Sequence, residues 1–290
     1  MHLCLKFNRK RVIDVYDCIP LINKKNIIKE YSDNNYHTII PRLLFNHEEI
    51  VLNETAKFIY KLINNEASMK KIIDSFCKNY TNITNEVAEM DVNEIIFMLW
   101  RFGIVEWKDI NPYRYQYFKQ FDGYSVEILL LETVSEFLIQ SKKCEYEYCN
   151  PYRFRKDIIQ KEFLEQAIVN RFSYSFIVRK EKEVALLGII SFDYQDFALT
   201  LDYLGLVSFE FVRNVDKQKQ DMILRWIEER VIIENKTILP NKSSSINWIV
   251  LSNDKDEKFE NYMNNLKPKN KFLLSNETID GDVMMYLFKR

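Results

Sequence analysis

Between residues 39 and 107, the apolar positions predict a strand, three helices and a second short strand. The first strand pattern ends at Leu52, and Asn53 directly after it is suited to cap the N-terminus of a helix. The helix that follows repeats apolar residues at i, i+3, i+4 and i+7, a spacing that predicts one buried face. Its apolar members are Ala56, Ile59, Tyr60 and Ile63.

Two further amphipathic helices are expected in this region. One begins near Ser68 and places on one side Ile72, Ile73, Phe76 and Tyr80. The other is predicted to start at an Asp91 cap and to end at Gly103. Its inner stripe consists of Val92, Ile95, Ile96, Leu99 and Phe102. The alternation over residues 104–107 predicts the closing strand.

The third predicted helix carries a second apolar stripe besides its buried one. Phe97, Trp100 and Arg101 stand at i, i+3 and i+4, and Asn93 lies one turn earlier. A second apolar stripe has to contact something. Three partners remain open, namely the rest of this chain, a second copy in a homodimer, or a peptide lying in a groove.

The N-terminal residues 1–35 alternate in patches that predict two or three antiparallel strands, completed by residues 36–40. With the helices and the closing strand, they form the layout of a winged helix-turn-helix with a small antiparallel sheet. Most domains of that layout bind DNA. The third helix has one base, Arg101, against the acids Asp91 and Glu94, so nucleic-acid binding is not expected. A DNA-binding regulator with a ligand-sensing half is kept as a lesser alternative.

After residue 110 the pattern changes. Residues 111–123 are rich in aromatic side chains, which predicts a short ordered helix as a connector. From residue 124 the expected order is strand, helix, aromatic loop, helix, hairpin, long strand, long helix, strand, helix and two strands. The chain is therefore predicted to be α+β, with domains at residues 1–110 and 124–290.

Composition narrows the range of functions. The 290 residues carry a formal net charge of −1, which predicts no general attraction to nucleic acid or anionic lipid. Five cysteines without C-x-x-C spacing encode neither a disulfide framework nor a zinc site, so no metal is expected. No apolar run reaches the ~18 residues of a membrane span, and the start lacks a secretory signal core. A cytoplasmic protein without membrane association is expected.

The first predicted domain resembles the PqqD-like recognition element of ribosomally made, post-translationally modified peptides. The likeness covers about residues 19–107 and rests on I-V-L-N-E-T-A-x-x-I, K-x-I-I-D, a D-V helix start and a final F-G-I-V-E-W. Members of that family bind the leader of a precursor peptide as an added strand and deliver it to a modifying enzyme. The resemblance implies strand contacts at Glu49, Ile50 and Val51 and contacts from the outer face of the third helix. The candidates on that helix are Asn93, Phe97, Trp100 and Arg101.

The second predicted domain resembles the GNAT acyltransferase fold, an α/β domain with a mixed, mostly antiparallel sheet. The likeness covers about residues 124–290 and rests on element order, on V-A-L-L-G-I-I and on W-I-V-L-S-N. It implies acetyl-CoA or another acyl-CoA as cofactor, with its pyrophosphate on a glycine-bearing loop at a helix N-terminus. The matching residues 213–220 contain no glycine. This stretch carries three basic side chains, Arg213, Lys217 and Lys219. They could bind phosphates instead of the glycine loop, or they could simply form a solvated basic loop.

For acyl transfer to an amine, the GNAT resemblance suggests Glu210 and Tyr262 as the candidate base and acid. Each also has an ordinary role open to it, Glu210 at an exposed strand end and Tyr262 in the core. Two functions of different classes result. The protein either binds a leader peptide and takes part in its modification as an N-acyltransferase, or it is a non-catalytic adaptor. In the adaptor, the second domain has lost its cofactor and is a docking or dimer surface.

Overall fold

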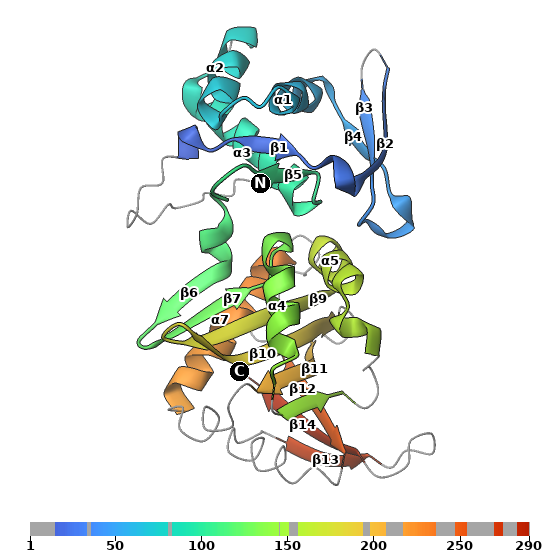
Figure 1. The fold of residues 1–290 in the computed structure, drawn as a ribbon, viewed down its shortest axis with the longest axis vertical. Coiled ribbons are helices and arrows are strands. Elements are labelled where there is room, and N and C mark those ends of the chain that lie inside the picture. The colour runs from blue at the N-terminus through green and yellow to red at the C-terminus, as the bar shows by residue number, and fades with distance from the viewer. Residues whose placement is uncertain are drawn as a thin grey trace. The chain divides into compact units, whose positions relative to one another are not determined.

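The computed structural model describes residues 15–33, 36–80, 83–144, 146–150, 156–193, 198–206, 217–235, 247–253, 270–274 and 283–289. The chain divides into two compact units, Met1–Arg114 and Tyr115–Arg290 (Figure 1). Both units combine helices with antiparallel strands, which confirms the α+β prediction. None of the helices in the described ranges is long and apolar enough to cross a membrane.

The first two helices of the first unit begin where the sequence predicts, and each follows a polar cap. At the start of α1 (Glu54–Asn64), Asn53 Oδ1 accepts a hydrogen bond from the N–H of Ala56 at 2.9 Å. Ser68 caps α2 (Met69–Asn79) in the same way. These caps satisfy N–H groups that have no partner within the helix. The predicted apolar faces of both helices are largely buried.

Helix α3 (Asn85–Arg101) begins seven residues earlier than the predicted Asp91 cap requires. Its cap is Thr84, whose Oγ1 accepts from the N–H of Val87 at 3.3 Å, and Asp91 lies inside the helix. The prediction was wrong because Ala88, fully buried, continues the inner stripe one turn before Val92. A small apolar residue followed by acids gave too weak a periodic signal to extend the helix.

The end of α3 agrees with the prediction. Gly103 has a φ of 70°, a left-handed conformation that glycine adopts without strain. The N–H of Ile104 donates to the carbonyl of Leu99 at 2.9 Å, which closes the helix end. The chain then enters β5 (Val105–Trp107), which pairs antiparallel with β1 (Pro20–Ile22). The winged arrangement itself stays a prediction.

A separate three-stranded antiparallel sheet completes the first unit. Its strands β2 (Ile27–Ser32), β3 (His37–Pro41) and β4 (Ile50–Leu52) lie in that order, so β4 is at an edge. The register pairs Val51 of β4 with Thr38 of β3. Short 3₁₀ segments lie at Val15–Asp17, Lys24–Asn26 and Phe45–His47.

The second unit is built on one large sheet in the order β13-β14-β12-β11-β10-β9-β7-β6, with β8 paired to β11. Among the strands described, only β11 and β12 are parallel neighbours, as the prediction of a mixed, mostly antiparallel sheet requires. The bounds are β6 Phe118–Phe121, β7 Tyr124–Ile128, β8 Tyr146–Cys149, β9 Ser173–Lys180, β10 Glu183–Asp193, β11 Ala198–Leu206, β12 Asn247–Asn253, β13 Asn270–Leu274 and β14 Val283–Lys289.

Two strands of this sheet replace segments that were predicted differently. The expected connector helix contains a 3₁₀ turn (Arg114–Tyr117) followed by strand β6, which pairs with β7. The expected aromatic loop contains β8, which pairs with β11. Both strands are only four residues long, so their local sequence pattern is weak. They are strands because they pair with neighbouring strands of the sheet. The helix expected between the strands now seen as β12 and β13 lies outside the described residues.

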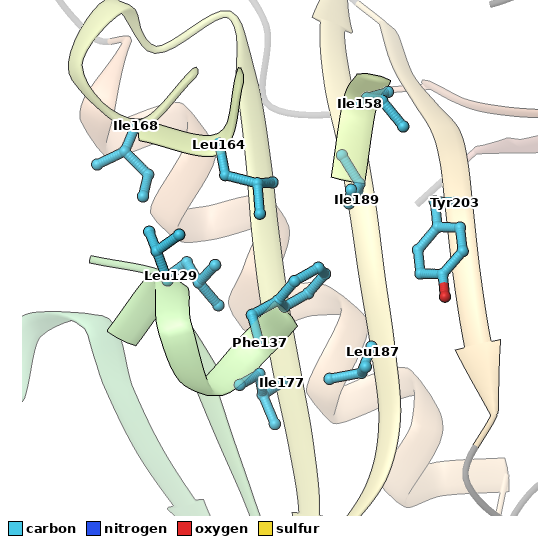
Figure 2. Packing of buried hydrophobic residues seen from close by; sticks show 10 residues of the cluster. Leu129, Phe137, Ile158, Leu164, Ile168, Ile177, Leu187, Ile189 and Tyr203 are labelled. Carbon is cyan, nitrogen blue, oxygen red and sulfur yellow. The ribbon is translucent and has the colours of Figure 1, made fainter. Parts of the chain in front are cut away.

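Helices cover both faces of the large sheet. Helices α4 (Val134–Ser141) and α5 (Lys161–Asn170) lie on one face, and α7 (Lys217–Glu234) lies on the other (Figure 1). Figure 2 shows the core under α4 and α5, where Phe137 and Leu164 from the helices meet Ile177 and Leu187 from the strands. On the other face, Glu228 of α7 accepts a hydrogen bond from the Trp248 indole at 3.2 Å.

Candidate functional site

A groove of about 360 Å³ lies between strand β4 and helix α3 in the first unit. The strand and the start of α1 line one side with Val51, Leu52, Asn53, Thr55 and Ala56. Helix α3 lines the other side with Asp91, Glu94, Ile95 and Met98. These four helix positions repeat at i, i+3, i+4 and i+7, so they form one stripe along α3.

The strand side of the groove is an open sheet edge. Among the described residues, β4 pairs only with β3, so its other edge offers backbone N–H and C=O groups to a further strand. Leu52 is buried and the Asn53 cap begins α1, which together hold β4 in place. Val51, directly before Leu52, is 57% exposed. A fixed, accessible strand edge of this kind is suited to bind an extended peptide.

The groove is acidic and apolar. Asp91 and Glu94 supply carboxylates, Ile95 and Met98 supply apolar surface, and none of the lining residues is basic. Around β4, acidic side chains are also exposed at Glu48, Glu49 and Glu54. Glu49 Oε2 accepts a hydrogen bond from the Tyr31 hydroxyl at 3.1 Å. The potential at this surface is therefore negative.

The second apolar stripe of α3 is covered by the chain itself. Phe97 and Trp100 contact the ring of Tyr113, with centroids 5.0 and 5.3 Å away, and the Trp107 ring lies 5.5 Å from Tyr113. We call these four residues the aromatic seam. Trp100 is 5% exposed and Tyr113 is 3% exposed. Of the three partners left open by the sequence, the structure places the chain's own connector against this stripe.

The seven candidate peptide contacts thus divide into two groups. Glu49, Ile50 and Val51 lie in or next to β4, and of these three only Val51 lines the groove. The helix candidates Asn93, Phe97, Trp100 and Arg101 are absent from the groove lining. The carbonyl of Asn93 accepts from the Tyr113 hydroxyl at 3.2 Å, and Arg101 is buried with its guanidinium 5.9 Å from the Trp100 ring.

Sequence reasoning missed the groove residues on α3, although their spacing was visible. The stripe of Asp91, Glu94, Ile95 and Met98 has the same period as the aromatic stripe. The prediction favoured the aromatic stripe because its side chains are larger, and this stripe does not line the groove.

Residues 42–105 match the family model of coenzyme PQQ synthesis protein D (PqqD). The matched region contains β4, α1, α2 and α3, and hence the whole groove. The first unit therefore carries a PqqD region, as the sequence motifs indicate. No curated protein matches the chain.

Several solved acetyltransferase structures are similar to part of the chain. A ribosomal-protein-S5-alanine acetyltransferase from Vibrio fischeri has 10% identity and a TM-score of 0.35, and covers 59% of this chain and 94% of its own. A ribosomal L7/L12 alpha-N-protein acetyltransferase in complex with coenzyme A has 10% identity and a TM-score of 0.38, with 58% and 94% covered. A chimera of the spermidine N-acetyltransferase SpeG from Vibrio cholerae has 12% identity and a TM-score of 0.39, with 58% and 95% covered.

The residues that the GNAT resemblance implies are only partly within the described ranges. Glu210, Arg213 and Tyr262 lie outside them, and Lys217 is the first residue of α7. Lys219 Nζ lies 3.2 Å from Asp122 Oδ2 in the β6–β7 turn and 5.6 Å from the centroid of the Tyr124 ring. Lys219 is thus engaged by two side chains of its own unit. The described residues include no group of three or more His, Cys, Asp or Glu side chains placed to hold a metal ion.

Strand β8 fills the gap where β11 and β12 separate. The parallel pair is in register only at Ala198–Thr200 with Asn247–Ile249, and beyond this β11 pairs with β8 instead. The Tyr148 hydroxyl of β8 bonds to β12 across the gap, donating to the Leu251 carbonyl and accepting from the Leu251 N–H at 3.2 Å. The carboxyl ends of parallel strands are a common place for ligands to bind. Here the chain's own strand occupies that place.

Burial and hydrogen bonding hold β8 in this position. Burial raises the pKa of Tyr148 far above its usual range, so its hydroxyl stays protonated and able to donate. Asn150, which follows β8 and is fully buried, donates from its backbone N–H to the Asp202 carbonyl at 2.9 Å. Its side-chain Nδ2 donates to the Leu201 carbonyl at 3.3 Å. Removing β8 from the sheet would leave these buried polar groups unpaired.

A polar cluster joins the small sheet to α1 outside the groove lining. Glu30 accepts hydrogen bonds at 2.6 Å from both Lys24 Nζ and the Tyr60 hydroxyl. Burial alone would raise the pKa of Glu30, but these donors, with the charges of Lys24 and His37, outweigh burial and lower it. The cluster therefore stabilises the ionised form of Glu30.

Proposed function

We propose that the first unit binds the leader segment of a ribosomally made precursor peptide as a strand added to β4. The observation that supports this most is the open β4 edge beside the α3 groove, within the region that matches PqqD. Backbone pairing with β4 provides affinity that depends little on the peptide sequence. The side chains of α3 across the groove provide selectivity.

The proposal is tested with a fluorescently labelled synthetic peptide encoded by a short open reading frame next to this gene. Fluorescence anisotropy with the full chain is expected to show saturable binding. Met98→Ala is expected to weaken binding about fivefold, the equivalent of ~1 kcal/mol of lost apolar contact. Met222→Ala, which truncates an exposed methionine of the second unit, is the matched control and leaves the affinity unchanged. Equal affinity of the Met98 variant and the control would show that the groove is not the binding site.

For the second unit, the structure favours the adaptor over the N-acyltransferase. Strand β8 fills the gap between the diverging strands β11 and β12, Lys219 is engaged by Asp122, and the stretch expected to bind pyrophosphate has no glycine. In this function a separate enzyme modifies the bound peptide, and the second unit is a docking or dimer surface. Tethering the leader to such an enzyme would raise the local concentration of the substrate.

Calorimetric titration with acetyl-CoA and longer acyl-CoAs separates the two functions. The adaptor predicts no binding heat at millimolar ligand. Saturable binding at micromolar concentration, together with a mass increase of the precursor peptide by one acyl group, would establish the N-acyltransferase instead. This experiment does not depend on whether the groove binds a leader.

A further inference from the structure

The charge of the groove restricts the kind of peptide that it accepts, an inference that rests on the proposed leader binding. We propose that the groove takes an extended segment with lysine or arginine side chains next to apolar ones. The α3 stripe has its acids, Asp91 and Glu94, toward the start of the helix and its apolar residue Met98 toward the end, with Ile95 between them. A peptide strand that complements this stripe has basic side chains beside Asp91 and Glu94 and an apolar side chain beside Met98.

The groove acids are available to a guest. Among the described residues, neither Asp91 nor Glu94 forms an ion pair, and no basic residue lines the groove. The ammonium of Lys57, on the neighbouring helix α1, keeps its charge but is directed to the carbonyls of Asp33 and Tyr36, at 2.7 and 3.3 Å. Arg101 is buried beside Trp100. Neither of these bases is paired with a groove acid, so both carboxylates can pair with a guest.

The surroundings of β4 extend the same preference. Glu48 and Glu49 precede the strand, Glu54 follows it, and all three side chains are exposed. A guest strand paired along β4 would pass these carboxylates at both ends. Acidic side chains on the guest would be repelled by these carboxylates, which costs binding free energy. Basic side chains would be attracted to them.

Two labelled twelve-residue probe peptides test the proposal, one alternating leucine with lysine and the other alternating leucine with glutamate. Both present the same apolar residues and the same backbone to β4, so their difference reports charge. The full chain is expected to bind the lysine probe at least tenfold more tightly, by fluorescence anisotropy in 50 mM salt. Raising the salt to 500 mM is expected to reduce this preference because salt screens exposed charges.

The doubly substituted variant Asp91→Asn with Glu94→Gln locates the preference. It removes two charges with little change in shape and is expected to weaken binding of the lysine probe by about 2- to 30-fold. Asp74→Asn with Glu162→Gln removes two exposed acids outside the groove and is the matched control, with no expected loss. Far-UV circular dichroism confirms that both variants are folded.

The possible results separate this inference from the proposed function. Equal binding of both probes, or an unchanged preference in the groove variant, would refute charge selection and leave leader binding intact. Charge selection is also refuted if neither probe binds, while the peptide encoded next to this gene binds the wild type and the groove variant equally well. Should that peptide bind and lose affinity in the groove variant alone, charge selection is supported. If neither the probes nor that peptide bind, the proposed function itself fails.

Discussion

Replacing Trp100 by alanine tests whether the aromatic seam is part of the core or part of a ligand site. Trp100 is almost completely buried and contacts Phe97 and Tyr113, with ring centroids 5.6 and 5.3 Å away. The substitution removes one of the three rings that contact Tyr113. It also removes the ring that lies 5.9 Å from the buried Arg101 guanidinium.

The expected cost is about 3–5 kcal/mol in the free energy of unfolding, the range for a buried tryptophan replaced by alanine. Each of the two ring contacts accounts for ~0.5–1.5 kcal/mol beyond the buried area. Since folded domains are stable by about 5–15 kcal/mol in total, the variant is expected to lose about a fifth or more of that stability. Tyr113→Phe, which removes the hydrogen bond to the Asn93 carbonyl and keeps the ring, is expected to cost about 0.5–1.5 kcal/mol.

Urea unfolding of the full chain, followed by circular dichroism at 222 nm, measures the loss. Amide hydrogen exchange over α3 shows whether the loss lies in the first unit, because the two units need not unfold together. Met98→Ala on the same helix is the control, since Met98 is 37% exposed and its truncation is expected to cost less than ~1 kcal/mol. A Trp100→Ala variant as stable as the Met98 variant would refute the assignment of the seam to the core.

Three smaller perturbations test other parts of the structure. Asn53→Ala removes the cap of α1 and is expected to cost ~1 kcal/mol in urea unfolding. Gly188→Ala places a methyl group against the buried Phe176 ring and is expected to cost about 1–3 kcal/mol, seen as a lower Tm. Glu30 has a lowered pKa, so its stabilisation is complete above its ordinary pKa of 4.5 and is lost as pH falls through the folded-state pKa. Glu30→Gln should therefore be less stable than the wild type at pH 7 and lose less stability on acidification, which thermal unfolding between pH 7 and 3 measures.

Local signals in the sequence predicted much of the first unit. A cap followed by apolar residues at helical spacing predicted α1 and α2, and a glycine with alternating residues after it predicted the end of α3 and strand β5. These features depend on neighbours within a few positions, so the sequence shows them directly. The start of α3 was missed because only Ala88 continues the stripe there.

Features that depend on distant partners were not predictable in this way. Strands β6 and β8 exist because they pair with β7 and β11. The two outer stripes of α3 have the same spacing, and nothing local shows that Tyr113, twelve or more residues later, covers one of them. Size and aromatic character favoured Phe97 and Trp100 as ligand contacts, but the same properties make them suited to packing within the unit.

Under the proposed leader binding, the arrangement around α3 would allow peptide selectivity to change without loss of the fold. One stripe of the helix is buried in the core. The second, with Phe97 and Trp100, is covered by Tyr113, and the third borders the groove. Substitutions in the first two stripes remove buried contacts, and their cost appears in stability. Asp91, Glu94 and Met98 of the third stripe are not buried, so their substitution is expected to change which peptides bind and to leave the unit folded. The proposal thus assigns stability and peptide selectivity to different residues of one helix, and measuring both properties for each variant tests this assignment.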